Sequence, residues 1–189
     1  MATATLSVRK ERPRDYVGMV FSVRPSSPAA DLGLLAARIV LAWIFIYYGA
    51  GKLFGAFSGP GLHRWSLYMS NVAHLHPGGF FAVLGALIEF GSGVAMAVGF
   101  LARLAGLALF GDMVMAMITV TWATGINSIN SPPGYQLNIA LAVLALAVAV
   151  IGAGRFSVDA VVARRLRVGK DDSPGALVST QATPRPTAS

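Results

Sequence analysis

The chain has 189 residues, of which 55% are hydrophobic and only 12% are charged, and its mean hydropathy is +0.64. Soluble domains carry about 25% charged residues, so this composition excludes an ordinary soluble protein and indicates a membrane protein. Cysteine is absent, which excludes disulfides, thiol redox chemistry and iron–sulfur ligation by this chain itself. The formal charge of +7 comes mostly from residues that flank apolar segments. That pattern favours contact with anionic lipids and argues against nucleic-acid binding.

Residues 1–31 form a polar tail that is interrupted by prolines and contains Arg9, Lys10, Arg12 and Arg14. A tail this polar is not typical of a cleavable signal peptide, so we expect the first apolar segment to direct membrane insertion. Asp31 stands directly before that segment and is expected to be the N-cap of its helix.

Four apolar segments follow, at residues 32–57, 79–100, 102–124 and 134–152. Each is close to the roughly 20 residues that a helix needs to cross about 30 Å of hydrocarbon. The sequence therefore predicts an all-α fold, an integral membrane four-helix bundle over residues 32–153. Basic residues precede the first segment, lie between the second and third, and follow the fourth, whereas the other two loops contain only Arg64. This asymmetry predicts that both termini are cytoplasmic, with residues 154–189 as a basic, disordered tail.

The loop at residues 58–77 is the one long outward loop that this topology predicts. Apolar residues recur there at steps of three and four (Leu62, Trp65, Tyr68 or Met69, and Val72), which predicts a short amphipathic helix at the outer membrane interface. The same loop contains His63, His74 and His76. Their spacing is not diagnostic of a metal site, and we predict that the chain binds no metal.

Glu89 and Asp112 each lie near the middle of an apolar segment. A carboxylate in hydrocarbon costs several kcal/mol unless it is paired, hydrated or protonated, so such residues usually have a function. The two segments are joined by a short turn and must pack antiparallel, which places the two acids at the same level. Both acids, and Asn138 of the fourth segment, share a helix face with small residues, so the three are expected to converge inside the bundle.

The first segment contributes Arg38 and Lys52, which are fourteen residues apart and therefore share a helix face. We predict an intramembrane polar network of Arg38, Lys52, Glu89, Asp112 and Asn138. In it, Arg38 reaches the two acids, and Lys52 caps the outer end or extends to the lipid headgroups. If a single cation reaches the acids, one of them would carry a proton. Two interpretations stay open: the network locks the helices in register, or it handles protons or binds a polar head such as a quinone ring.

Several short motifs occur in a particular order. Arg38 begins the first segment, which ends in Gly-Ala-Gly-Lys-Leu-Phe at residues 49–54, and Glu89 is followed by Gly91 and Gly93. Two further motifs complete the set, namely Gly-Phe-Leu-Ala-Arg at residues 99–103 and a closing motif at residues 152–159 with Gly152, Gly154, Ser157 and Asp159. In this order and spacing, the motifs over residues 32–165 resemble the DoxX family of small bacterial membrane proteins.

This resemblance implies a four-helix membrane protein associated with redox assemblies. Members of the family are named for a subunit of a terminal quinol oxidase system and for thiosulfate:quinone oxidoreductase. The resemblance points to Arg38, Lys52, Glu89 and Asp159 as positions of interest. The chain departs from it at Gln136, where many relatives carry an acid, and this departure argues against a proton relay through the outer half of the bundle.

We therefore expect a non-catalytic integral subunit of a redox or respiratory assembly in the bacterial inner membrane. Its partners would be other membrane subunits and lipids, and it would have no intrinsic cofactor but would line a quinone site. One alternative is a quinone-reducing oxidoreductase subunit acting on a small sulfur anion such as thiosulfate, which Lys52 and Arg64 would attract. The lack of cysteine and of a nucleotide-binding motif counts against it. The other alternative is a small-solute or proton transporter, for which broken helices would be typical, whereas the apolar segments here look continuous.

Overall fold

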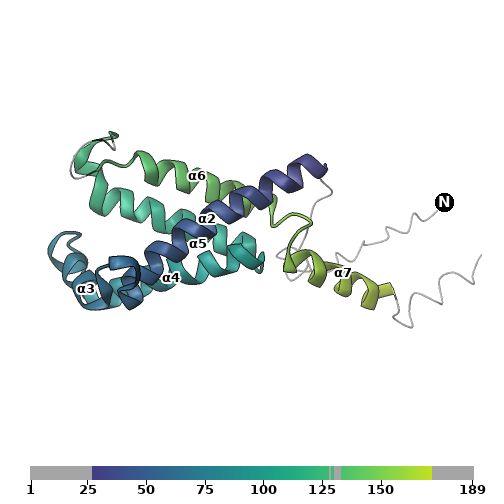
Figure 1. Cartoon of the computed structure of the whole chain (residues 1–189), viewed down its shortest axis with the longest axis horizontal. Coiled ribbons are helices and arrows are strands. Elements are labelled where there is room, and N and C mark those ends of the chain that lie inside the picture. The colour runs from purple at the N-terminus through teal and green to yellow at the C-terminus, as the bar shows by residue number, and fades with distance from the viewer. Residues whose placement is uncertain (1–26, 128, 130–132, 172–189) are drawn as a thin grey trace, which may run out of the picture.

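The structure is a computed structural model that describes residues 27–127, 129 and 133–171, and this part of the chain is helical (Figure 1). The α-helices are α2 (Pro28–Phe54), α3 (Gly61–Asn71), α4 (Gly78–Val98), α5 (Ala102–Ala116), α6 (Gln136–Ile151) and α7 (Val158–Asp171). Three short elements complete the fold: the 3₁₀-helix η1 (Ala56–Ser58), the π-helix η2 (Met117–Thr121) and the 3₁₀-helix η3 (Trp122–Thr124). The predicted N-terminal tail lies outside the described residues except for its last five, 27–31.

Three helical segments are long and apolar enough to cross a membrane: Pro28–Phe54, Gly78–Val98 and Ala102–Thr124. The fourth predicted span, α6, is apolar but has only 16 residues. At 1.5 Å per residue its length is about 24 Å, which is shorter than the hydrocarbon core of a typical bilayer. The all-α prediction is therefore confirmed, with three long apolar helices and one shorter one.

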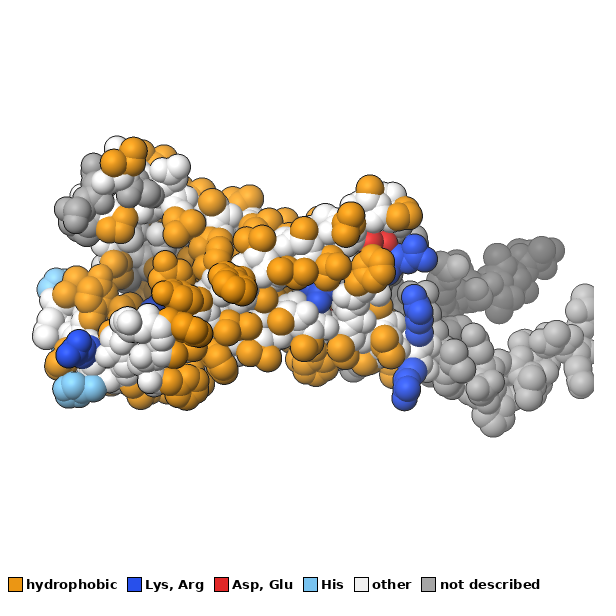
Figure 2. Space-filling model, in the orientation of Figure 1, with side chains coloured by type: hydrophobic (Ala, Val, Ile, Leu, Met, Phe, Trp, Pro, Cys, Tyr) orange, Lys and Arg blue, Asp and Glu red, His pale blue; other side chains and the backbone are white. Residues whose placement is uncertain are grey.

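The helices α2, α4, α5 and α6 run side by side, and α7 extends from one end of the group (Figure 1). α4 packs between α2 and α5, α5 packs against α6, and α3 packs against α4. The centre contains fully buried side chains from each of these four helices, among them Leu41, Met96, Leu109 and Val148. Hydrophobic side chains also cover the visible outer face between the two ends, as Figure 2 shows. An apolar surface of this kind is what a lipid-embedded bundle presents.

The N-terminus of α2 differs from the prediction. Asp31 is not the N-cap, because the helix already begins at Pro28. Ser27 is the N-cap, and its hydroxyl accepts a hydrogen bond from the Ala30 amide at 3.3 Å. Proline suits the first helical position because it has no N–H to leave unpaired. Asp31 instead lies in the first turn with 1% of its surface exposed, so it is available to another part of the chain.

The C-terminal segment also differs from the prediction. Disorder was expected over residues 154–189, but Val158–Asp171 form α7. Ser157 stabilises the start of this helix, because its hydroxyl accepts a hydrogen bond from the Ala160 amide at 3.1 Å. Residues 172–189 lie outside the part of the chain that the structure describes.

Close approach of α2 and α4 depends on glycine. A Cβ atom added to Gly49 would lie 2.6 Å from the backbone nitrogen of Phe90, and one added to Gly93 would lie 2.9 Å from the backbone nitrogen of Ile46. Neither neighbour can move like a flexible side chain, because both contacts are with backbone atoms. Small residues at such positions let membrane helices pack closely.

We predict that Gly49→Ala destabilises the bundle by about 1–3 kcal/mol, because it forces α2 away from α4. Gly91→Ala is the matched control: Gly91 is an exposed helical glycine, and a Cβ there would have no neighbour within 4 Å. The thermal midpoint in detergent should fall for Gly49→Ala and stay equal or rise for Gly91→Ala, since alanine favours the helix. Equal midpoints for the two variants would contradict the packing argument.

Candidate functional site

The polar residues predicted to form one network lie in two separate places. Lys52, Glu89, Asp112 and Asn138 border one cavity, whereas Arg38 contacts the closing motif at the end of the bundle where α7 begins. The prediction that Arg38 reaches the two acids is wrong. The physical reason is that backbone carbonyl oxygens near Arg38 already accept its hydrogen bonds.

Arg38 is almost completely buried, with 1% of its surface exposed. Its Nε donates to the Met96 carbonyl at 3.0 Å, and its Nη1 donates to the carbonyls of Ala153 and Phe156 at 2.8 and 2.9 Å. Met96 belongs to the last turn of α4, whose carbonyls have no partner within the helix and carry partial negative charge. Arg38 therefore joins α2, the end of α4 and the segment between α6 and α7.

The closing motif is also used to stabilise helix ends. The Asp159 carboxylate accepts hydrogen bonds from the amides of Leu101 and Ala102, at 2.8 and 3.0 Å, and so caps the start of α5. Gly152 and Gly154 have φ values of 105° and 74°, a region that favours glycine. The Ser157 hydroxyl donates to the Gly154 carbonyl at 2.7 Å, which closes the turn before α7.

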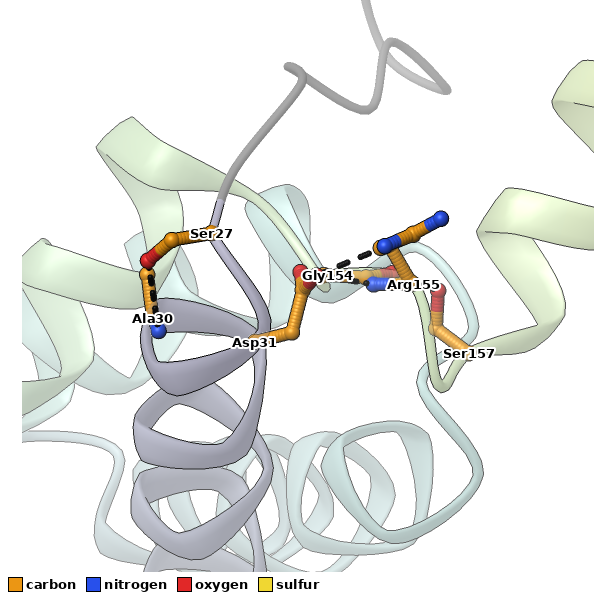
Figure 3. Close-up of polar contacts among 6 residues, drawn as sticks. All are labelled: Ser27, Ala30, Asp31, Gly154, Arg155 and Ser157. Atoms are coloured by element: carbon orange, nitrogen blue, oxygen red, sulfur yellow. Dashed lines mark hydrogen bonds and ion pairs between the residues drawn. The ribbon is translucent and has the colours of Figure 1, made fainter.

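Asp31 completes the contacts at this end. Its Oδ1 accepts a hydrogen bond from the Arg155 amide at 3.2 Å, and its Oδ2 lies 3.8 Å from Arg155 Nε (Figure 3). On the other side, Arg103 donates to the carbonyls of Val150 and Ile151, at 3.0 and 3.1 Å, and so satisfies the end of α6. We call Asp31, Arg38, Arg103 and Asp159, with the residues they contact, the helix-end cluster. Its four charged side chains hydrogen-bond to backbone groups of other segments, so the cluster has a structural role.

A cavity of about 320 Å³ lies between α3, α4, α5 and η2. Its polar lining includes Lys52, Trp65, Glu89, Asp112, Thr121 and Asn138. Its apolar lining includes Leu75, Phe81, Leu84, Ile88, Met115 and Val120. Ligand sites typically combine an apolar wall with a few converging polar groups, so this cavity is the candidate functional site.

Lys52 forms an ion pair with Glu89, and the two side chains are 17% and 6% exposed. Lys52 Nζ also lies 4.3 Å from the centre of the Trp65 ring, a cation–π contact. Lys52 is thus turned inward to an acid and an aromatic ring, and it does not extend away from the bundle. Its positive charge is already matched by a neighbouring carboxylate.

The carboxyl groups of Glu89 and Asp112 border the same cavity and are close enough to interact electrostatically. The two acids, which were predicted to lie at the same level, therefore belong to one site. Glu89 Oε2 and Asp112 Oδ2 are buried, and no N–H or O–H donor of the described residues reaches them. Two neighbouring buried carboxyl groups repel each other when both are ionised, so a cation beside them is favourable. Lys52, which pairs with Glu89, supplies that cation.

Two further buried polar atoms around the cavity have no hydrogen-bond partner among the described residues: Trp65 Nε1 and Thr121 Oγ1. Leaving a buried donor unpaired costs free energy, and such groups are usually satisfied by water or a ligand. Asn138 also borders the cavity, where its amide makes only a long contact of 4.0 Å with Met113 Sδ. The cavity therefore offers donors to a molecule with hydrogen-bond acceptors.

Thr121 was not among the predicted site residues. It belongs to η2, a π-helix that interrupts the third apolar segment beside the cavity. A π-helix widens the backbone spiral and changes which side chains face inward, and such segments are frequent at functional sites. Three consecutive residues of this region, Thr119, Val120 and Thr121, line the cavity. A regular α-helix would spread three consecutive residues around its circumference, so periodicity gave no signal for this site.

The predicted helix at residues 58–77 is present as α3, and it contributes Trp65 and Met69 to the cavity. Trp65 stacks on Tyr68 with a centroid distance of 5.0 Å, and burial raises the pKa of the Tyr68 phenol, which keeps it neutral. The apolar side of α3 is thus directed in part to the site. Within residues 27–127, 129 and 133–171, no three His, Asp or Glu side chains are grouped closely enough to hold a metal ion.

Comparisons with known proteins place these residues in a family context. The sequence model of the DoxX family matches residues 33–122, which include Arg38, Lys52, Glu89 and Asp112. The chain is also 30% identical to Inner membrane protein YqjF of Escherichia coli (strain K12) over 131 residues, which cover 68% of this chain and 91% of that protein. No solved structure matches the chain significantly.

We predict that Arg38→Ala lowers stability by more than about 3 kcal/mol, because it leaves several buried carbonyls without a donor. Arg38→Lys should be intermediate, since an ammonium group keeps the charge but cannot reproduce the planar array of donors. Arg164→Ala, at an exposed arginine of α7, is the control and should leave the thermal midpoint unchanged. The measurement is the midpoint of thermal unfolding in detergent. A midpoint for Arg38→Ala equal to that of the wild type would contradict the structural role of Arg38.

Proposed function

Because this chain belongs to the DoxX family, we propose that it is an integral inner-membrane subunit of a redox assembly and that its internal cavity binds the head of a quinone. The inner-membrane location draws on its relative in Escherichia coli, which is named an inner membrane protein. The link to a redox assembly draws on the resemblance to family members that are named for quinol oxidase and thiosulfate:quinone oxidoreductase. In this role the chain contributes the site, and partner subunits carry the electron path.

We further propose that α2, α4, α5 with its extension, and α6 all span the membrane with both termini cytoplasmic. Arg103 lies in the first turn of α5, Arg155 in the segment between α6 and α7, and Arg164 and Arg165 in α7. Arg64 lies on α3. Lysine and arginine are enriched on the cytoplasmic side of membrane proteins. Figure 2 shows Lys and Arg side chains gathered at one end of the bundle, in agreement with this orientation. The short α6 then requires a locally thin bilayer or tightly packed neighbours.

The observation that carries the quinone proposal is the pair of unpartnered donors in a cavity with apolar walls and a buried acid pair. A quinone ring is flat and apolar and has two carbonyl oxygens, which can accept hydrogen bonds from Trp65 Nε1 and Thr121 Oγ1. The reduced form has two hydroxyl groups, which can donate to the oxygens of Glu89 and Asp112. Both redox forms of one ligand therefore find partners here. The apolar walls, which include Phe81, Leu84 and Ile88, suit the ring faces.

The charge of the cavity favours a neutral head over a small sulfur anion. The charge of Lys52 is offset by Glu89, and Asp112 adds either no charge or a second negative charge. An anion such as thiosulfate would therefore meet a neutral or negative site of low dielectric, which opposes its binding. Arg64, the other cation that an anion would need, is an exposed residue of α3 and does not line the cavity.

We predict that the chain, purified from native membranes in a mild detergent at its native expression level, is recovered with electron-transfer subunits and with quinone. Proteins are identified by mass spectrometry, and quinone is quantified after extraction with organic solvent. Recovery of the chain alone, without quinone, would contradict both parts of the proposal.

We also predict that Asp112→Asn lowers the affinity for a water-soluble quinol by about tenfold or more, since the variant loses a carboxyl oxygen that accepts a hydrogen bond from a quinol hydroxyl. Gly111→Ala is the matched control on the same helix turn, because Gly111 is exposed and a Cβ there has no neighbour within 4 Å. The affinity is measured by titration of the purified protein, with the thermal midpoint as the check on folding. Equal affinities for Asp112→Asn and Gly111→Ala would show that Asp112 does not take part in binding.

A further inference from the structure

A second cavity, of about 160 Å³, lies between α2 and α6. We call it the seam cavity. Its walls are Ile44, Phe45 and Tyr48 of α2, Leu137 and Leu141 of α6, and Met113 of α5. Four residues border both this cavity and the first one: Lys52, Glu89, Ala116 and Asn138. The ion pair therefore stands between the two cavities.

The seam cavity leads from the outer surface of the bundle to the ion pair. At its outer side Tyr48 and Leu137 are half exposed, at 51% and 50%, whereas at its inner side Phe45 and Leu141 are 1% and 6% exposed. α2 contacts α6 much less than it contacts α4, so this is a poorly closed side of the bundle. On the membrane orientation proposed above, the surface around Tyr48 and Leu137 faces lipid.

We propose that the seam cavity holds the apolar tail of the molecule whose head occupies the first cavity, and that the molecule enters from the bilayer between α2 and α6. The inference rests on the proposed quinone function and narrows its ligand to a lipid-soluble amphiphile with a neutral head and a long apolar chain.

The chemistry of the walls supports this occupant. The seam cavity is lined by aliphatic and aromatic side chains except where it reaches Lys52, Glu89 and Asn138, the residues that it shares with the head site. Burial of a hydrocarbon chain against such walls is favourable at roughly 25 cal/mol per Å² of apolar surface. A water-soluble ligand would gain nothing from an apolar passage that connects its site to lipid. Small Ala116 and uncharged Asn138 also border both cavities, and on this proposal the chain passes beside them and leaves the ion pair in place.

The test compares two quinones with the same ring, one without a tail and one with a decyl tail, on the full chain in detergent. Leu137→Trp narrows the mouth of the seam cavity. Val143→Trp is the control on the same helix, because Val143 is 61% exposed and lines neither cavity. We expect Leu137→Trp to weaken decyl-quinone binding about tenfold or more, the loss for a few displaced methylene groups. The affinity for the quinone without a tail should stay unchanged, and Val143→Trp should bind both ligands as the wild type does.

A second measurement does not depend on the folding of a variant. A decyl quinone with a photoreactive group at the tail end is crosslinked to the wild-type chain, and the labelled residues are mapped by mass spectrometry. We expect labels on α2 and α6 around Ile44, Tyr48 and Leu137. Labelling confined to other faces, or an equal effect of Leu137→Trp on both quinones, would overturn the seam proposal alone. Failure of the wild type to bind either quinone would overturn the head site as well, so the two failures are distinguishable.

Discussion

The guanidinium of Arg38 donates hydrogen bonds to carbonyl oxygens at the end of α4 and in the segment between α6 and α7, and the arrangement of the other helices depends on this. A buried cation is stable only when its donors are satisfied, and here backbone carbonyls satisfy them, including one at the C-terminal end of α4, where the helix carries partial negative charge. Asp159 supplies the complementary negative charge at the N-terminus of α5. The helix-end cluster thus sets the relative positions of the helices at the end where α7 begins.

With that end closed, the other half of the bundle can tolerate an internal space. Lys52 pairs with Glu89 instead of with a backbone group, and Glu89 in turn lies close to Asp112. The two basic residues of α2 therefore have different physical roles. Arg38, with its planar set of donors, satisfies carbonyls from two segments, whereas Lys52, with a compact charge on a flexible chain, borders a cavity. This division separates the residues that hold the fold from those that are available to a ligand.

The cavity and the seam combine two environments that an amphiphile requires. Trp65 and Thr121 offer unpaired donors beside the two acids, while Ile44, Phe45 and Leu141 line an apolar cavity between α2 and α6. The π-helix η2 brings Thr121 to this site at some loss of regular α-helical hydrogen bonding. A π-helix persists when the surrounding structure stabilises it. Here η2 borders the cavity that holds most of the buried, unpaired polar atoms of the described residues.

The sequence by itself determined the membrane character, the apolar helices, the family and the shared site of Glu89 and Asp112, because composition, helical period and a short turn constrain these directly. It also pointed to Lys52 and Asn138 as residues of the same site. Only the tertiary structure decided which groups Arg38 and Lys52 contact. The helical period places both residues on one face of a helix, but it says nothing about backbone carbonyls from distant segments. The N-cap at Ser27, the helix at Val158–Asp171 and the π-helix with Thr121 were missed for a related reason. Each depends on contacts between segments, or on a local change of helix geometry, that hydrophobic periodicity along a single chain does not encode.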